Sequence, residues 1–211
     1  MSNQPVRDAY SHMSEQYIAL FDGDWQAHVD DTALVRDHLV GLDGAVLDLG
    51  CGPGHWSAYL HSLGANVTGV DLVPEFIGYA RTHFPGPAFQ LGSMTDLDLP
   101  DHSVAGILSW YSTIHLPPSE LDAVLAEFRR MLPPSGNLVI GFFDSDDDVA
   151  AFDHKVHTAY RWPVDTFSAR LAKAGFTELQ RLQQQSPDRP DRKYAAIAAT
   201  VARRSARSAH S

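Results

Sequence analysis

From residue 45 onward, short apolar runs alternate along the chain with segments whose apolar positions recur at helical spacing. An almost uninterrupted apolar run is typical of a buried strand, and recurrence on one side of a helical wheel is typical of an amphipathic helix. Strands are predicted over 45–49, 66–71, 88–91, 104–110 and 138–143, and helices over 55–63, 74–83 and 118–132. Because strands that alternate with helices favour right-handed parallel crossovers, the pattern predicts an α/β fold. Its doubly wound, mostly parallel sheet should carry helices on both faces.

The two ends of the chain follow other patterns. Apolar residues at helical spacing predict a helix over 5–21 and, after a Gly-Asp break, a second one over 26–40. Near the other end, a predicted helix over 165–174 precedes two strand-like stretches, 176–185 and 192–202, which are joined by a turn rich in Pro and Asp. A short turn between two strands predicts an antiparallel hairpin. The hairpin should close one edge of the sheet and bring it to seven strands.

We expect one main domain with short extensions, because 211 residues suffice for one sizeable core. The expected division is an N-terminal helical lid over 1–44, the main domain over 45–202 and a disordered basic tail over 203–211. The aspartate-rich segment 144–162 is predicted to be a solvated loop and helix start, in preference to a site for a cationic substrate.

Composition restricts the partners that the chain is expected to have. A formal net charge of −10 argues against a surface that neutralises phosphates, so no nucleic-acid partner is predicted. No apolar stretch reaches the length of a membrane span, and a soluble cytoplasmic protein is expected. The single cysteine, Cys51, permits no internal disulfide and fits a reducing compartment. We interpret it as a small residue beneath a ligand in preference to a reactive thiol. The sequence leaves the oligomeric state open.

The most informative motif joins the first predicted strand to the helix behind it and reads Val46-Leu47-Asp48-Leu49-Gly50-Cys51-Gly52-Pro53-Gly54. Three glycines at alternate positions leave no Cβ atoms on the turn, so its backbone can approach a bound molecule closely. Ligands of such sheets bind outside the carboxyl ends of the strands, where the strand order reverses. The other candidate segments therefore follow the later strands: Asp71, residues 92–96 and residues 109–115.

Over residues 45–143 these segments resemble the class I S-adenosylmethionine-dependent methyltransferases of the small-molecule, single-domain kind. The resemblance implies a Rossmann-like methyltransferase fold that binds S-adenosyl-L-methionine within 45–202. It implies that Gly50 and its neighbours line the methionine moiety, that Asp48 organises the ammonium group and that Leu72 packs against the adenine. The two oxygens of Asp71, at the end of the second strand, are suited to accept both ribose hydroxyls. An alternative role for Asp71 is to cap the helix that follows it.

The third strand departs from the family pattern. Gly92-Ser93-Met94 stands where the family often has Gly-Asp-Ala. Ser93 can accept the same adenine hydrogen bond without a charge, and Met94 supplies a polarisable contact to a flat ring. The full set of predicted cofactor-binding residues is Tyr17, Asp48, Gly50, Cys51, Gly52, Gly54, Asp71, Leu72, Ser93, Met94 and Ser109.

The catalytic candidates are Tyr111 and His115, because the segment from Ser109 to Pro117 is similar to the part of the family that passes beneath the transferring methyl. His115 could act as a general base with a pKa near its usual value of about 6.5, or be a hydrogen-bonded loop residue. Tyr111 could be a wall of the ligand site or part of the core. Tyr10 and Tyr17 are candidates to close over the sulfonium.

The predicted function is O- or N-methylation of a small-molecule acceptor by in-line methyl transfer, with secondary metabolism as one setting. A non-catalytic S-adenosylmethionine-binding regulatory subunit and an RNA methyltransferase stay open as alternatives. A nicotinamide-dependent dehydrogenase is disfavoured, because its loop reads Gly-x-Gly-x-x-Gly. No metal is predicted, since His154 and His157 form a pair at helical spacing without a third ligand.

Overall fold

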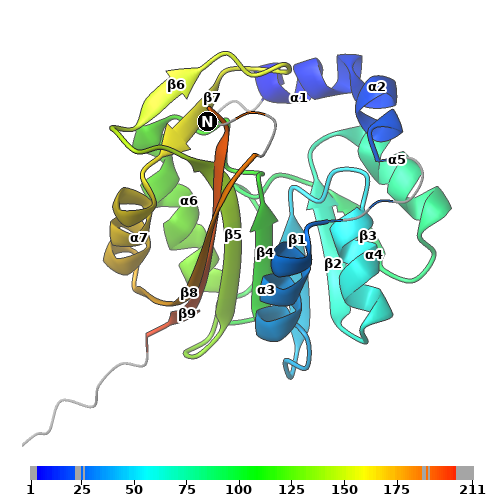
Figure 1. Ribbon diagram of the computed structural model, residues 1–211. Coiled ribbons are helices and arrows are strands. Elements are labelled where there is room, and N and C mark those ends of the chain that lie inside the picture. Colours follow the sequence, from blue (N-terminus) through cyan, green and yellow to red (C-terminus); the bar gives the residue numbers. More distant parts are fainter. Residues whose placement is uncertain (1–3, 22–24, 26, 187–188, 190, 203–211) are drawn as a thin grey trace, which may run out of the picture.

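The computed structural model describes residues 4–21, 25, 27–186, 189 and 191–202 (Figure 1). Within these residues one sheet runs in the order β3-β2-β1-β4-β5-β7-β6, and β9 pairs with both β5 and β8. The strands are β1 (Ala45–Leu49), β2 (Asn66–Asp71), β3 (Ala88–Leu91), β4 (Gly106–Trp110), β5 (Asn137–Asp144), β6 (Ala150–Phe152), β7 (Ala159–Trp162), β8 (Phe176–Gln185) and β9 (Lys193–Val201). The helices are α1 (Gln4–His12), α2 (Ser14–Ala19), α3 (Val29–Leu39), α4 (His55–Ser62), α5 (Pro74–His83), α6 (Pro118–Met131) and α7 (Val164–Lys173).

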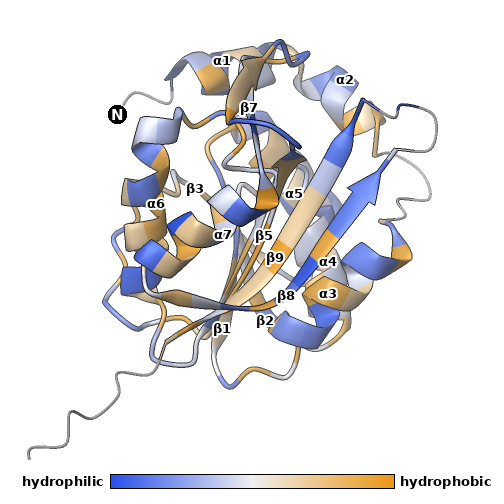
Figure 2. Ribbon diagram, turned by 60° about the vertical axis from the view of Figure 1, so that its left-hand side comes forward, coloured by the Kyte–Doolittle hydropathy of each residue, from blue (hydrophilic) through white to orange (hydrophobic). Residues whose placement is uncertain are grey.

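The predicted doubly wound, mostly parallel sheet is confirmed, but within the described residues it has nine strands instead of seven, because β6 and β7 were not predicted. Strands β1 to β5 pair in parallel, and their ends lie within two residues of the predicted ones. Strand β9 runs antiparallel to both β5 and β8, which confirms the C-terminal hairpin. Strand β8 is polar along most of its length and β9 is apolar (Figure 2). The edge of this part of the sheet is therefore a hydrophilic strand, which discourages pairing with another chain.

Alternation along the central strands divides the core into two layers. In β5, Leu138 and Ile140 belong to a cluster that also holds residues of α6 and α7, whereas Val139 between them belongs to a cluster with residues of α3 and α4. Successive side chains of a strand point to opposite faces, so a continuous apolar strand must be covered on both sides. Figure 1 shows α6 and α7 on one side of the sheet and α3 and α4 on the other.

The hairpin of β6 and β7 corrects the prediction for 144–162, where a solvated loop and helix start were expected. Strand β7 continues the sheet beside the end of β5, with Phe143 opposite Arg161 and Asp144 opposite Trp162. The buried Trp162 packs on the ring of Phe167. Three of the acids in the loop are exposed as predicted, but Asp144 is buried. Strands of three and four residues are too short to produce a recognisable alternation.

The N-terminal helices differ slightly from their prediction. The expected helix over 5–21 is divided at Met13 into α1 and α2, and both lie across the carboxyl ends of the strands (Figure 1). This position agrees with the expected lid, although the boundary at residue 44 stays a prediction. The predicted basic tail, 203–211, lies outside the described residues.

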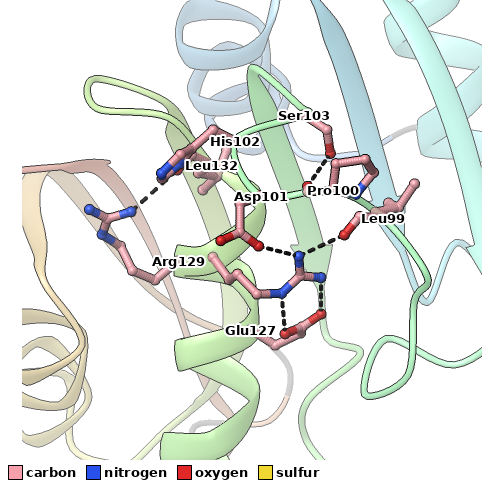
Figure 3. Close-up of polar contacts among 9 residues, drawn as sticks. Leu99, Pro100, Asp101, His102, Ser103, Glu127, Arg129 and Leu132 are labelled. Carbon is pink, nitrogen blue, oxygen red and sulfur yellow. Dashed lines mark hydrogen bonds and ion pairs between the residues drawn. The ribbon is translucent and has the colours of Figure 1, made fainter.

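An ion-paired cluster closes the opposite end of the sheet. The guanidinium of Arg130 on α6 donates to both carboxylate oxygens of Glu127, to Asp101 and to the carbonyl of Leu99 (Figure 3). These bonds fasten the connection between β3 and β4 to the end of α6. They lie at the amino end of β4, away from the carboxyl ends where a ligand is expected.

Candidate functional site

A cavity of about 780 Å³ lies at the carboxyl ends of the strands. It sits where the strand order reverses between β1 and β4, the position at which open α/β sheets bind ligands. Its volume is in the range of small-molecule sites. Its walls come from α1, α2, the glycine turn after β1, the segment after β4, the β6–β7 hairpin and the turn between β8 and β9.

Two glycines of the turn are required by the packing of the protein itself. Gly50 has φ of 77°, and a Cβ atom there would lie 2.2 Å from Cβ of Ser112. Gly54 has φ of 97°, and a Cβ atom there would lie 2.9 Å from Cβ of Ala80. Both sites combine a left-handed backbone with a neighbour that leaves no space for a side chain. Gly54 was predicted to bind the cofactor, but it is not among the residues that line the cavity.

Gly52 is the glycine of the turn with open space in front of it. Its φ is 52°, it lines the cavity, and the nearest atom to a Cβ placed there would be Cε1 of Tyr17 at 4.0 Å. Its backbone N–H donates to Oδ2 of Asp71 at 2.8 Å. The turn therefore presents bare backbone to the cavity at this position, with Tyr17 of the lid above it.

Asp71 ends β2 at the wall of the cavity, as predicted. Its Oδ1 accepts a hydrogen bond from the N–H of Val73 at 2.9 Å, and its side chain is buried among the lining residues. Burial raises the pKa of Asp71 to about 6, although three backbone N–H groups oppose the shift. The capping alternative is wrong, because the residue at the N-cap of α5 is Val73. Each carboxylate oxygen keeps capacity to accept a further hydrogen bond.

Asp48 also lines the cavity and is more deeply buried, with 1% of its surface exposed. Its Oδ2 accepts a hydrogen bond from the hydroxyl of Ser57 at 2.6 Å. Burial, together with the nearby charge of Asp71, raises the pKa of Asp48 to about 7. Neither carboxylate forms an ion pair with any cation of the described residues. A cationic ligand would supply the missing counter-charge.

The other predicted cofactor-binding residues divide into two groups. Cys51, Leu72 and Met94 line the cavity, whereas Ser93 and Ser109 do not. The Ser93 hydroxyl bonds to that of Thr95, and Ser109 is fully buried with its hydroxyl 2.8 Å from that of Ser112. Ser109 thus supports the residue that packs against the glycine turn.

Burial raises the pKa of the Cys51 thiol. The thiolate is the reactive form of cysteine, so this result agrees with the interpretation of Cys51 as a small packing residue.

His115 is held from both sides. Its Nδ1 lies 2.8 Å from the carbonyl of Thr158 and its Nε2 lies 2.9 Å from the hydroxyl of Tyr10. A carbonyl can only accept, so Nδ1 carries the proton and Nε2 accepts from Tyr10. Burial, opposed by the bond to Thr158 and aided by His154 and His157, lowers the pKa of His115 to about 4. The expected value near 6.5 is therefore wrong, and the imidazole is neutral at physiological pH.

Tyr111 follows β4 with a φ of 54°, which is uncommon for a residue other than glycine. Its N–H donates to the carbonyl of Gly141 at 3.0 Å, and its ring packs against those of Phe143 and Tyr194. Burial raises the pKa of its hydroxyl above the usual range. Its ring lines the cavity, so Tyr111 is a wall of the site.

Comparison with known proteins supports the expected family. Residues 46–136 match the family model described as "Methyltransferase domain". This match, together with the relatives and solved structures, supports a class I S-adenosylmethionine-dependent methyltransferase. A curated relative is the malonyl-[acyl-carrier protein] O-methyltransferase of Yersinia pestis, 37% identical over 136 residues that make up 64% of this chain and 49% of the relative. The chain spans about half of the length of the curated relatives it matches.

Solved structures agree on the fold. The 1,6-didemethyltoxoflavin-N1-methyltransferase of Burkholderia thailandensis, solved with S-adenosylhomocysteine, has a TM-score of 0.79 and 24% identity, covering 94% of this chain and 88% of that one. A [4+2]-cyclase, SpnF, has the same TM-score with 18% identity, covering 96% and 97% of the two chains. Because one fold carries both reactions, the function must be argued from the site. No helix in the described part of the chain has the length and apolarity to cross a membrane.

Aromatic contacts join α1 and α2 to α5. The rings of Tyr10 and Tyr17 meet edge to face at 5.5 Å, and both pack against Phe76 of α5. Tyr10 also reaches across to His115, as described above, and Ser11 donates to Glu75 at 2.8 Å. Both tyrosines line the cavity. The structure thus places them over the cavity, where the sequence predicted the lid.

Sequence reasoning missed the basic end of the cavity. Five of the sixteen Lys and Arg residues of the chain line it: Lys155, Arg161, Arg189, Arg192 and Lys193. They come from the β6–β7 hairpin and from the turn between β8 and β9. The one signal that the sequence offered was that Lys and Arg residues lie near the ends of these strands, although the chain as a whole is acidic. Among the described residues, no group of three or more His, Cys, Asp or Glu is placed to hold a metal.

Proposed function

We propose that the protein transfers the methyl group of S-adenosyl-L-methionine to a small-molecule acceptor, at O or N. The observation that carries the proposal is the pair of buried carboxylates, Asp48 and Asp71, which face the cavity beside a bare glycine turn without a cationic partner among the described residues. The family match and the names of the relatives support the same reaction class.

The residues present fit this cofactor. Asp71 is positioned to accept the ribose hydroxyls, and Asp48 to face the cationic methionine end. Gly52 offers backbone without a side chain, and Leu72 and Met94 offer apolar surface for the adenine. When bound, S-adenosyl-L-methionine supplies an electrophilic methyl group on a positively charged sulfur.

The contribution of the chain to the reaction is mainly alignment and exclusion of water. Holding two reactants in line can be worth about 7–11 kcal/mol in well-oriented cases. The lid rings Tyr10 and Tyr17 cover the turn and face the cavity, so they shield the reacting atoms from solvent. The face of an aromatic ring attracts a cation, so these two rings also favour a positively charged ligand.

His115 has a different role from the general base of the sequence prediction. Its Nε2 already accepts a hydrogen bond from Tyr10, and its low pKa makes it a weak base. We propose that His115 acts as a positioning residue that fastens the lid. It can take a proton from an acceptor only after the Tyr10 hydroxyl leaves Nε2.

Isothermal titration calorimetry with S-adenosyl-L-methionine and S-adenosylhomocysteine tests the proposal. We expect both to bind, and Asp71→Asn to weaken binding by about tenfold to a hundredfold, because hydrogen bonds to a charged group are among the stronger ones. Asp101→Asn is the matched control, since Asp101 lies at the opposite end of the sheet (Figure 3). Absence of binding by the parent protein would overturn the proposal.

Turnover separates an enzyme from a binding subunit. Radiolabelled methyl donor is incubated with the protein and with fractionated metabolites or total RNA of the host. Label in a small molecule supports the proposal, label in RNA supports the RNA methyltransferase alternative, and binding without any transfer supports a non-catalytic subunit.

A further inference from the structure

The basic end of the cavity, made of Lys155, Arg161, Arg189, Arg192 and Lys193, runs against the overall charge of the chain. The chain carries a formal net charge of −10, yet five cations gather on one wall. Strand β7 and the start of β9 pair with the same two residues at the end of β5, Phe143 and Asp144, one on each edge. The basic end adjoins the end of β5, which β4 separates from β1, so the basic end and the glycine turn occupy different parts of the cavity.

Two of the five cations are already neutralised. Arg189 pairs with Asp191 through two nitrogens, and Lys193 pairs with Asp146. Arg161 has no ion pair with an acid of the described residues. Its guanidinium instead lies over the ring of Phe152, 4.4 Å from the centroid. Cation–π contact leaves the hydrogen-bonding edge of a guanidinium free to bind an anion.

Lys155 and Arg192 complete the unpaired group, since neither forms an ion pair with an acid of the described residues. The remaining acids near these cations are Asp153, which is exposed, and Asp31, which accepts a hydrogen bond from Gln184 at the end of β8. The three unpaired cations therefore outnumber the two carboxylates. A ligand with a negative charge would restore the balance.

His154 provides an independent observation at the same place. Its Nδ1 is buried and has no hydrogen-bond partner among the described residues. A buried polar atom without a partner costs about 1–3 kcal/mol and calls for an explanation. The ring lies between His115, at 5.4 Å, and Phe143, at 5.8 Å, on the wall of the cavity. A ligand oxygen that accepts from Nδ1 would satisfy it.

We propose that the basic end of the cavity binds an anionic group, a carboxylate or a phosphate, that anchors the methyl acceptor. Arg161 and Arg192 supply the charge, and Nδ1 of His154 donates a hydrogen bond. This inference rests on the proposed function and adds the chemical class of its acceptor. The body of the acceptor then lies against the rings of Tyr111 and Phe143, with the methyl-accepting atom toward the glycine turn.

The arrangement also gives the cavity a direction. Carboxylates occupy the end proposed for the cationic cofactor, and guanidinium groups occupy the other end. An acceptor that carries a positive charge is repelled from the basic end, which is a source of selectivity. The electrostatic pattern therefore fixes which end of an anionic acceptor faces the sulfonium.

Four ring compounds of similar size test the proposal: benzoate, phenyl phosphate, benzamide and benzylamine. Each is titrated into protein saturated with S-adenosylhomocysteine and labelled at histidine, and the ring resonances are followed by NMR. We expect benzoate or phenyl phosphate to shift the resonances of His154, and the neutral and cationic rings to leave them unchanged. A comparison of the affinities for benzoate and for phenyl phosphate then shows whether the site prefers a carboxylate or a phosphate.

Arg161→Gln should weaken binding of the anionic probe by about tenfold or more, because it removes a charge-assisted hydrogen bond. Arg170→Gln is the matched control, since Arg170 also lies over an aromatic ring but on α7, outside the cavity. Arg192→Gln repeats the test at an exposed position where packing is not at risk.

The inference is overturned if benzamide binds as well as benzoate, if neither anion shifts His154, or if both arginine variants bind the anion like the parent. The affinity for S-adenosylhomocysteine is measured first in each protein. If the parent protein does not bind S-adenosylhomocysteine, the proposed function is contradicted. Retained affinity without preference for the anion contradicts the anionic anchor alone.

Discussion

The two ends of the cavity are built in different ways. At the glycine turn the ligand surface is backbone, and its shape is fixed by packing, as Gly50 against Ser112 shows. At the basic end the surface consists of long side chains such as Arg161, held by a ring and by the hairpin beneath it. A backbone surface can change only if the packing changes. A side-chain surface can change by single substitutions, so the acceptor end is the part of this fold that is free to vary.

Gly50→Ala is the strongest test of this difference. The new Cβ would lie 2.2 Å from Cβ of Ser112 at a left-handed φ, so both overpacking and backbone strain apply. We expect a loss of about 2–5 kcal/mol in the free energy of unfolding, measured by urea denaturation. Gly64→Ala is the control, because its φ is 90° and nothing lies within 4 Å of the new atom. It should cost only about 1 kcal/mol. Equal losses in the two variants would contradict a turn fixed by packing.

The same contrast explains what the sequence could predict. The strands were predicted because they are apolar runs, and the turn because its three glycines lie at alternate positions of one short segment. Asp71 was found from its place at the end of β2. The β6–β7 hairpin gave no periodic signal, since its strands have three and four residues. Two of the five basic residues, Lys155 and Arg161, lie on this hairpin, so the gathering of the five at one end of the cavity could not be predicted.

Two errors at the site have a related cause. The bond between Tyr10 and His115 joins residues 105 positions apart, so the low pKa of His115 depends on a contact that no local pattern contains. Ser109 was placed in the site because it ends the right strand. The side chain of Ser109 points toward Ser112 and away from the cavity, and this direction decides its role.

The pH dependence of binding should also differ between the two ends. Burial raises the pKa of Asp71 to about 6 and that of Asp48 to about 7, so both lose their charge as the pH falls through these values. Their neighbours Tyr10, Tyr17 and His115 stay neutral between these values, because burial shifts the pKa of each away from this range. The affinity for cationic S-adenosyl-L-methionine should therefore rise by about tenfold from about pH 5 to about pH 8.

Calorimetry across this range checks the expectation, with Asp71→Asn as the comparison. The variant should show a smaller rise, because one of the two titrating groups is gone. The arginines of the basic end keep their charge throughout, and benzoate is ionised across this range, so binding of benzoate should not follow the same curve. An affinity for the methyl donor that is constant with pH would show that neither carboxylate needs to be ionised for binding.

Tyr10→Phe gives the smallest effect and tests whether the two ends are coupled. The Tyr10 hydroxyl bonds to His115 at 2.9 Å, and the ring of His115 lies beside that of His154 at the basic end. Removing the hydroxyl should cost about 1 kcal/mol and raise the dissociation rate of S-adenosylhomocysteine by about fivefold, measured by stopped-flow fluorescence. Tyr59→Phe removes a comparable hydroxyl bond, to the carbonyl of Thr32, outside the cavity and should leave the rate unchanged. If both variants release the ligand like the parent, the bond does not hold the lid, and His115 is free to serve the acceptor instead.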